Sequence, residues 1–109
     1  MKMNQIDTEY NLLKILKDNP EMTQRQLSKE LGLSLGKINY VLHAFMDKGL
    51  MKLSNFKRSD NKIGYLYLLT PEGIEEKSIL AQHFLKRKSI EYNRLKKEIE
   101  TLKNELLER

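Results

Sequence analysis

The sequence predicts a mainly helical α+β fold, in which a compact helical body with one small β-hairpin precedes a long C-terminal helix. Three observations predict it: two helical patterns divided by a glycine at residues 23–49, two strand patterns divided by a polar turn at residues 50–69, and no proline or glycine after Gly73. With 109 residues, 39% apolar and 32% charged, the chain can form one modest hydrophobic core. We expect a compact domain at residues 1–70 and a helical extension at residues 71–109.

The first helix is expected at residues 8–17, TEYNLLKILK. Tyr10, Leu13 and either Leu16 or Lys17 recur at helical spacing on one face, which Leu12 and Ile15 flank. Pro20 follows the segment and ends it, because a proline disfavours the helical conformation in the residue before it. This helix is expected to pack against the core.

A tight turn separates the next two helices. Thr23 can cap the second helix, with Gln26 three residues later completing a capping box. Gly32 tolerates the left-handed backbone that ends this helix, and Ser34 can cap the third. The third helix has one apolar face, formed by Ile38, Val41, Leu42 and Phe45. Two helices about such a turn are typical of a helix-turn-helix that inserts its second helix into DNA.

The outer face of the third helix carries side chains that can read bases. Lysine suits the acceptors of guanine, asparagine can pair with adenine through two hydrogen bonds, and tyrosine can donate its hydroxyl or pack on a thymine methyl. A glycine there either allows close approach to the DNA backbone or is simply tolerated in a first helical turn. The alternative interpretation of this face is an ordinary solvated surface. The residues predicted to contact DNA are Ser34, Gly36, Lys37, Asn39, Tyr40 and His43.

The N-terminus of the second helix is a further candidate contact with DNA. Thr23, Gln24 and Arg25 lie where free backbone N–H groups and the positive end of the helix dipole suit a phosphate. Helix capping is the alternative role of these residues, and both roles can coexist.

A basic hairpin follows the third helix. Residues 50–57 and 65–69 have strand patterns, and the polar segment between them predicts an extended loop. The net charge is +5 and the pI about 9.4, and the excess positive charge lies beside the third helix. Between positions 48 and 62 the charged residues are Lys48, Lys52, Lys57, Arg58 and Lys62 against Asp60 alone.

Such a hairpin directly after a helix-turn-helix is a wing. We expect Lys57, Arg58 and Lys62 to contact phosphate or the minor groove, the alternative being an ordinary solvated hairpin. Tyr65 and Tyr67 share one face of the second strand and are expected to support the core or the wing.

A single long helix is expected after the hairpin. Thr70 supplies a hydroxyl cap, Pro71 suits the first helical position, and Glu72 complements the helix dipole. From Tyr92 the apolar residues step by 3 and 4 positions, the heptad spacing of a coiled coil that we expect from about residue 85. The predicted dimerisation residues are Leu85, Tyr92, Leu95, Ile99, Leu102 and Leu106.

The charges that flank this apolar seam favour a parallel homodimer. In that register glutamates occupy g positions and lysines occupy e positions, so Glu91 would face Lys96 and Glu98 would face Lys103 across the dimer. An antiparallel pair would place like charges opposite one another. Each exposed pair contributes only a few tenths of a kcal/mol, so the charges select orientation while the apolar seam supplies affinity.

The sequence lacks the residues that several functional classes require. Two distant histidines, no cysteine and no glycine-rich phosphate loop leave no constellation for catalysis, for a metal or for another cofactor, so an enzyme is not expected. No apolar run approaches the roughly 20 residues of a membrane span, and the polar N-terminus lacks a signal-peptide core. We expect a cytoplasmic protein without a membrane partner.

The order of elements resembles the MarR family of winged-helix transcriptional regulators over roughly residues 8–85. The segment from Ser34 to Leu50 is similar to the family's serine-capped recognition helix with its closing Lys-Gly-Leu turn, and Leu69-Thr70-Pro71-Glu72-Gly73 is similar to the sequence after its wing. The short length, the Ser-Leu-Gly-Lys-Ile-Asn-Tyr helix start and the heptad tail look most like small regulators associated with exopolysaccharide gene clusters.

This resemblance implies a dimeric repressor or activator with each recognition helix in the major groove and each wing at the adjacent minor groove or backbone. Asp60 and Lys62 stand where the family usually has an Asp-x-Arg pair. Lysine cannot make the forked contacts of arginine, so Lys62 is expected to give affinity more than sequence preference. Many relatives also dimerise through an additional N-terminal helix and hold small aromatic effectors between the dimer and DNA-binding regions. This N-terminus is too short to supply much of that dimer interface, which argues against an effector pocket.

The functional hypothesis is a sequence-specific regulator of transcription that binds double-stranded DNA as a homodimer on a pseudo-palindromic operator, with exopolysaccharide genes as candidate targets. The alternative is a winged-helix module for protein–protein interaction or assembly without specific DNA binding. Clustered basic charge favours the first, because an apolar docking surface does not require it.

Overall fold

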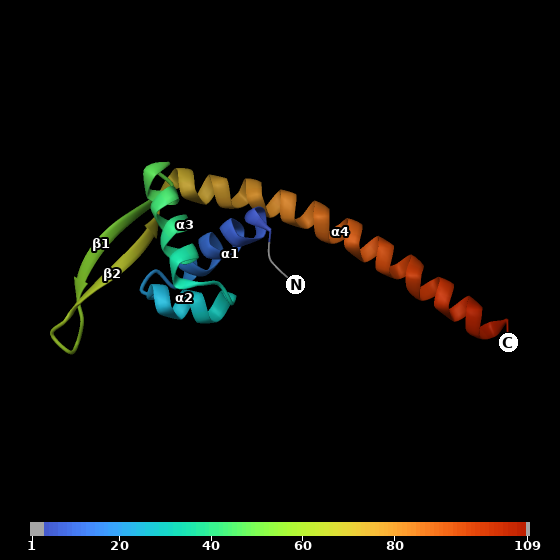
Figure 1. Ribbon diagram of the computed structural model, residues 1–109. Helices are drawn as coiled ribbons and strands as arrows, with labels where there is room; N and C mark the ends of the chain where they lie inside the picture. The colour runs from blue at the N-terminus through green and yellow to red at the C-terminus, as the bar shows by residue number, and fades with distance from the viewer. Residues whose placement is uncertain (1–3, 109) are drawn as a thin grey trace.

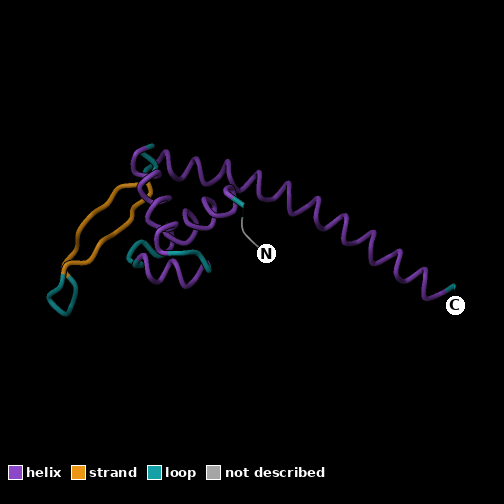
Figure 2. The backbone as a smooth tube through the Cα atoms, viewed as in Figure 1, coloured by secondary structure: helices purple, strands orange, loops and turns teal. Residues whose placement is uncertain are grey.

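The computed structural model describes residues 4–108, and its fold is the one expected from the sequence: mainly helical, with a two-stranded antiparallel hairpin and a long C-terminal helix. Figures 1 and 2 show the short helices gathered into a body, with the hairpin projecting from one end and the last helix extending from the other side. The molecule measures 69 × 29 × 22 Å. The elements are α1 (Gln5–Asp18), α2 (Gln24–Leu31), α3 (Leu35–Asp47), β1 (Met51–Lys57), β2 (Ile63–Leu69) and α4 (Pro71–Leu107).

Local capping chemistry fixes the starts of α2 and α3. The hydroxyl of Thr23 accepts the backbone N–H of Gln26 at 3.1 Å, and the Gln26 side chain accepts the N–H of Thr23 at 2.9 Å, which confirms the capping box. Gly32 has φ +65°, the left-handed conformation that ends α2. The hydroxyl of Ser34 then accepts the N–H of Lys37 at 3.1 Å.

The first helix begins earlier than the sequence analysis expected. Its cap is Asn4, whose side chain accepts the backbone N–H of Asp7 at 2.9 Å. Thr8, the first residue of the expected helix, is buried within it, and its hydroxyl donates to the Asn4 carbonyl. Asparagine is a strong N-cap residue, so the cap was available in the sequence.

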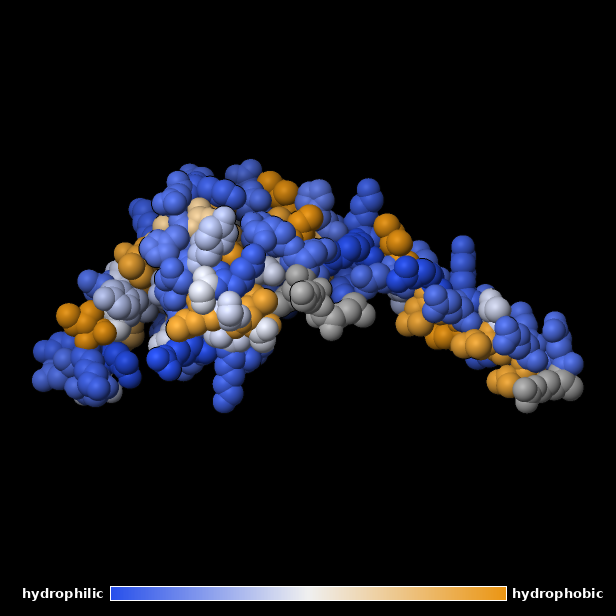
Figure 3. Space-filling view, in the orientation of Figure 1, coloured by the Kyte–Doolittle hydropathy of each residue, from blue (hydrophilic) through white to orange (hydrophobic). Residues whose placement is uncertain are grey.

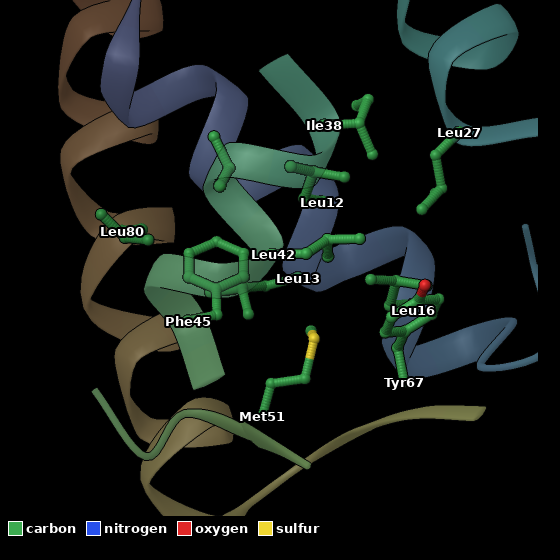
Figure 4. Close-up of a cluster of buried hydrophobic side chains, with 11 residues drawn as sticks. Leu12, Leu13, Leu16, Leu27, Ile38, Leu42, Phe45, Met51, Tyr67 and Leu80 are labelled. Carbon is green, nitrogen blue, oxygen red and sulfur yellow. The ribbon is translucent and has the colours of Figure 1, made fainter. Parts of the chain in front are cut away.

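One hydrophobic core joins the three short helices, the base of the hairpin and α4 (Figure 4). The apolar faces of α1 and α3 supply most of it, which confirms the helical periodicity read from the sequence. The buried apolar residues are Leu12, Leu13, Leu16, Leu27, Ile38, Val41, Leu42, Phe45, Met51, Tyr67 and Leu80.

The hairpin pairs β1 with β2 in one continuous register, from Met51 opposite Leu69 to Lys57 opposite Ile63. The second strand therefore begins at Ile63 and not at Tyr65 as expected. The turn is tighter than the composition indicated, because the N–H of Arg58 donates to the Lys62 carbonyl at 2.8 Å and Asn61 takes φ +68°. Asparagine tolerates that conformation better than most residues.

The start of α4 is bonded to the turn between α3 and β1. Thr70 accepts the N–H of Gly73 at 3.1 Å, donates its hydroxyl to the Gly49 carbonyl at 2.6 Å, and donates its N–H to the Leu50 carbonyl at 3.1 Å. The cap predicted at Thr70 is therefore confirmed, and it also anchors the helix to the body.

The next turns of α4 pack along α1. Leu80 completes the core, the rings of Phe84 and Tyr10 lie 5.1 Å apart, and Arg87 pairs with Asp7. Beyond these contacts α4 runs away from the body (Figure 1). The division of the chain at residue 70 stays a prediction. In the described part of the chain, no helix combines the length and apolarity needed to cross a membrane.

Candidate nucleic-acid interface

The outer face of α3 is exposed and carries the side chains predicted to read bases. Tyr40 is 68% exposed, and Asn39 and His43 are also exposed. Ser34 and Gly36 lie at the exposed start of the helix. The helical spacing thus separates this polar face from the buried face that packs on the core.

Gly36 has open space where its side chain would be. A Cβ atom added there would meet no heavy atom within 4 Å, and the backbone does not have a positive φ. No contact or strain within the described chain therefore requires glycine at this position, although glycine costs about 1 kcal/mol relative to alanine in a helix interior.

The side chain of Lys37 makes contacts with neighbouring residues that the sequence did not indicate. Its Nζ donates to the Oε1 atom of Gln5 at 3.3 Å and lies 5.9 Å from the centre of the Tyr40 ring. Gln5 also donates to Glu9 at 2.9 Å. The ammonium group therefore leans toward the start of α1, and a contact with guanine would require it to exchange this exposed partner for the base.

Asn39 belongs to a second polar contact that crosses between elements. Its Nδ2 donates to Gln24 at 3.3 Å, and Gln24 in turn donates to the hydroxyl of Tyr67 at 3.3 Å. The side chain of Gln24 therefore faces the protein, whereas the roles expected for Gln24 from the sequence were phosphate binding and helix capping. Tyr67 is buried, as expected of a supporting residue, but Tyr65 is 52% exposed, so a supporting role in the core fits only Tyr67.

The N-terminus of α2 keeps two backbone donors at the surface. The capping box satisfies the N–H groups of Thr23 and Gln26. Those of Gln24 and Arg25 have no recorded partner among residues 4–108. Free donors at the positive end of a helix suit a phosphate, so the predicted contact remains compatible with this arrangement.

The basic side chains of the wing are all exposed. Arg58 lies 3.5 Å from Asp60 through its Nη2 atom, and both side chains are about half exposed. Such a surface pair is worth at most about 1 kcal/mol, so DNA phosphate can compete for the guanidinium. Lys57 and Lys62 are exposed and have no recorded ion pair among the described residues.

An open cleft of about 710 Å³ separates the wing from the start of α2. Thr23 and Gln24 line one side, and Lys57 and Arg58 line the other. Groups that suit phosphate therefore border the cleft on both sides. Within residues 4–108, no group of three or more His, Asp or Glu side chains could hold a metal ion.

The predicted seam of α4 is exposed along the free half of the helix. Figure 3 shows apolar side chains gathered along this part of the molecule. Leu85, Tyr92, Leu95, Ile99, Leu102 and Leu106 are each between 44% and 69% exposed. Phe84 lies beside this seam but is only half-exposed, because it packs on Tyr10 of the same chain.

Three helices, a wing and an exposed α3 face define a winged helix-turn-helix protein. Residues 7–50 match the family described as winged helix-turn-helix DNA-binding. No curated protein sequence matches the chain.

Solved structures of regulators share the fold. The adhesin competence repressor AdcR of Streptococcus pyogenes is 22% identical, with TM-score 0.60, over 86% of this chain and 66% of AdcR. ZitR of Lactococcus lactis, solved with DNA, is 21% identical, with TM-score 0.60, over 87% of this chain and 61% of ZitR. A zinc-bound AdcR, described as a zinc-dependent MarR family transcriptional regulator, is 19% identical, with TM-score 0.52, over 83% of this chain and 62% of that protein.

The alignments span less than two thirds of each of these regulators. The likeness shows a fold shared with these regulators, and the family matched over residues 7–50 is one of DNA-binding winged helix-turn-helix proteins.

Proposed function

We propose that this protein is a sequence-specific regulator of transcription that binds double-stranded DNA as a homodimer in the cytoplasm. The observation that carries the proposal is the outer face of α3, on which Asn39 and Tyr40 are exposed and Lys37 is half-buried beside Gln5. These three residue types can distinguish base pairs in the major groove. The helix itself is held from behind by a buried apolar face, so it is a rigid platform for these groups.

Basic groups around this helix supply the sequence-independent part of the proposed binding. Lys57, Arg58 and Lys62 belong to the wing, and the cleft between the wing and α2 is lined by Lys57 and Arg58 together with Thr23 and Gln24 at the start of α2. Contacts of this kind set the position of a protein on DNA, whereas contacts to base edges set its sequence preference. Removal of wing charges should therefore weaken binding to all duplexes.

The second copy in the proposed homodimer binds along the free half of α4. Six apolar residues there follow the heptad spacing and are exposed in the single chain. Burial of each leucine or isoleucine contributes about 1.5–3 kcal/mol, which makes this seam the main source of affinity. The Glu and Lys positions beside the seam favour parallel helices, as in Glu98 opposite Lys103 of the second copy.

Two-fold symmetry then defines the operator. A parallel dimer presents two equivalent α3 helices, so its site is an inverted repeat with half-site centres about 10–10.5 base pairs apart or a multiple of that spacing. The resemblance to small exopolysaccharide-associated regulators makes promoters of such genes the first natural sequences to test. No effector is part of the proposal.

The proposal is tested by selecting bound duplexes from a random DNA pool with the wild-type protein at near-physiological salt, followed by sequencing. We expect an enriched inverted repeat. Salt-sensitive binding without an enriched sequence would contradict specific recognition.

A protein-interaction module is the second candidate function. Exposed apolar side chains on the wing favour it, because Ile63 is 68% exposed and Tyr65 is 52% exposed. Random duplex DNA and heparin distinguish the two candidates. A protein that binds neither at low salt fits the interaction module, whereas salt-sensitive retention on both fits a DNA-binding protein.

A further inference from the structure

Gln24 connects the recognition helix to the hairpin. Although it is the first residue of α2, its side chain is half-buried and reaches two other elements. Its Oε1 atom accepts a hydrogen bond from Nδ2 of Asn39 in α3 at 3.3 Å, and its Nε2 atom donates to the hydroxyl of Tyr67 in β2 at 3.3 Å. One side-chain amide therefore bridges the exposed face of α3 and the base of the wing.

Tyr67 is a fixed anchor for this bridge. It is 6% exposed and belongs to the hydrophobic core (Figure 4). Its backbone N–H donates to the carbonyl of Pro20 at 2.9 Å, which ties the strand to the loop before α2. Because packing holds the ring, the phenol hydroxyl has a defined position relative to α2. The hydrogen bond between this hydroxyl and Gln24 therefore restricts the position of the Gln24 side chain.

The bridge leaves Asn39 able to read a base. A side-chain amide has two N–H donors and one carbonyl acceptor, and only one donor of Asn39 is used by Gln24. The remaining N–H and Oδ1 are the pair that recognises adenine, by donation to N7 and acceptance from N6. The bond to Gln24 also restricts rotation of the exposed side chain, so less conformational entropy is lost when the base binds.

We propose that Gln24 is a positioning residue that orients Asn39 for base recognition, and that Tyr67 anchors Gln24. This inference rests on the proposed function, because it assigns the origin of sequence preference at one base pair. The positioning role and a phosphate contact by the Gln24 side chain have different consequences. A positioning residue changes the preference among bases at the pair read by Asn39, whereas a phosphate contact changes affinity for all sequences equally.

The test begins with Asn39→Ala, which identifies the base pair whose preference depends on Asn39. The duplex selected by the wild-type protein and its three single-pair variants at that position then compete for each protein. We expect Gln24→Ala to reduce the preference at this pair by about 3- to 10-fold, the effect of losing one net hydrogen bond. Tyr67→Phe changes a side chain that is buried in the core, and we expect it to reduce the same preference by a smaller factor.

Two controls separate positioning from other effects. Tyr65→Phe removes a hydroxyl from the same strand, but Tyr65 has no recorded hydrogen bond to α2 or α3 among the described residues, so the base preference should be unchanged. The double variant Gln24→Ala, Asn39→Ala should show no further change in preference beyond Asn39→Ala alone. The Thr23 and Gln26 capping box stays intact in these variants, and far-ultraviolet circular dichroism checks that α2 still forms.

The results distinguish this inference from the proposed function. A wild-type protein that selects a sequence, with Gln24→Ala retaining the same preference at every pair, would overturn only the positioning role. Binding of Gln24→Ala that is weaker by the same factor for all duplexes would also overturn it, in favour of a phosphate contact. A wild-type protein that selects no sequence would contradict both proposals.

Discussion

Gly73 gives the most direct test of how α4 is attached to the body. A Cβ atom added at Gly73 would overlap the carbonyl oxygen of Leu50 and lie 3.0 Å from its carbonyl carbon. The same carbonyl oxygen accepts the N–H of Thr70, whose hydroxyl caps α4, so it cannot move away without loss of these bonds. Gly73→Ala must therefore displace the helix start from the turn between α3 and β1.

The expected cost follows from these contacts. Overpacking of a buried site typically destabilises by about 1–3 kcal/mol, and the gain in helix propensity from glycine to alanine opposes it by up to about 1 kcal/mol. Since each kcal/mol shifts the midpoint of a domain of this size by about 4–8 °C, we expect Tm to fall by several degrees. Thermal unfolding followed by circular dichroism at one fixed protein concentration measures this, because dimerisation makes Tm depend on concentration.

Gly36→Ala is the matched control, since it changes the same residue type in the first turn of a helix. An added Cβ atom meets no heavy atom within 4 Å there, so the protein should keep or raise its stability by up to about 1 kcal/mol. A Gly73→Ala protein as stable as Gly36→Ala would refute the close approach of α4 to Leu50.

Three further predictions concern the seam, the core and the wing. Leu102→Lys should raise the dimer Kd by about 100-fold, because two buried leucines are lost per dimer, whereas Leu107→Lys, off the seam and 81% exposed, should leave it unchanged; sedimentation equilibrium measures both, and equal effects would contradict the heptad register. Leu80→Ala should lower the free energy of unfolding in urea by about 2–5 kcal/mol, and a loss below 1 kcal/mol would show that α4 does not complete the core. Neutralisation of Lys57, Arg58 and Lys62 to glutamine should weaken binding to all duplexes and reduce the salt slope by up to about 3 per protomer; an altered base preference with an unchanged slope would argue against phosphate contacts.

Local chemistry explains why much of the fold was predictable from sequence. The caps at Thr23, Ser34 and Thr70 need only residues within three positions, and the left-handed turn at Gly32 needs only a glycine. The buried and exposed faces of α3 follow from helical periodicity alone. The hairpin was less predictable. The left-handed conformation of Asn61 allows a tight turn, so the second strand begins at Ile63, earlier than expected.

Contacts between distant residues account for what sequence reasoning missed at the candidate site. Gln24 and Tyr67 are 43 positions apart, and Lys37 and Gln5 are 32 apart. A polar side chain at a helix start is equally suited to phosphate, to solvent or to a neighbouring element, and only the packing of β2 against the body selects the last for Gln24. The exposure of the α4 seam agrees with dimerisation, but the parallel dimer and the DNA contacts stay predictions.

The central claim is that the exposed face of α3 recognises a specific DNA sequence. The most direct measurement compares the affinity of the wild-type protein for its selected inverted repeat with that for a scrambled duplex of the same length and composition, at physiological salt. We predict that the repeat binds at least about 1,000-fold more tightly, the lower end of the range for specific DNA-binding proteins. Equal affinity for the two duplexes would contradict the claim.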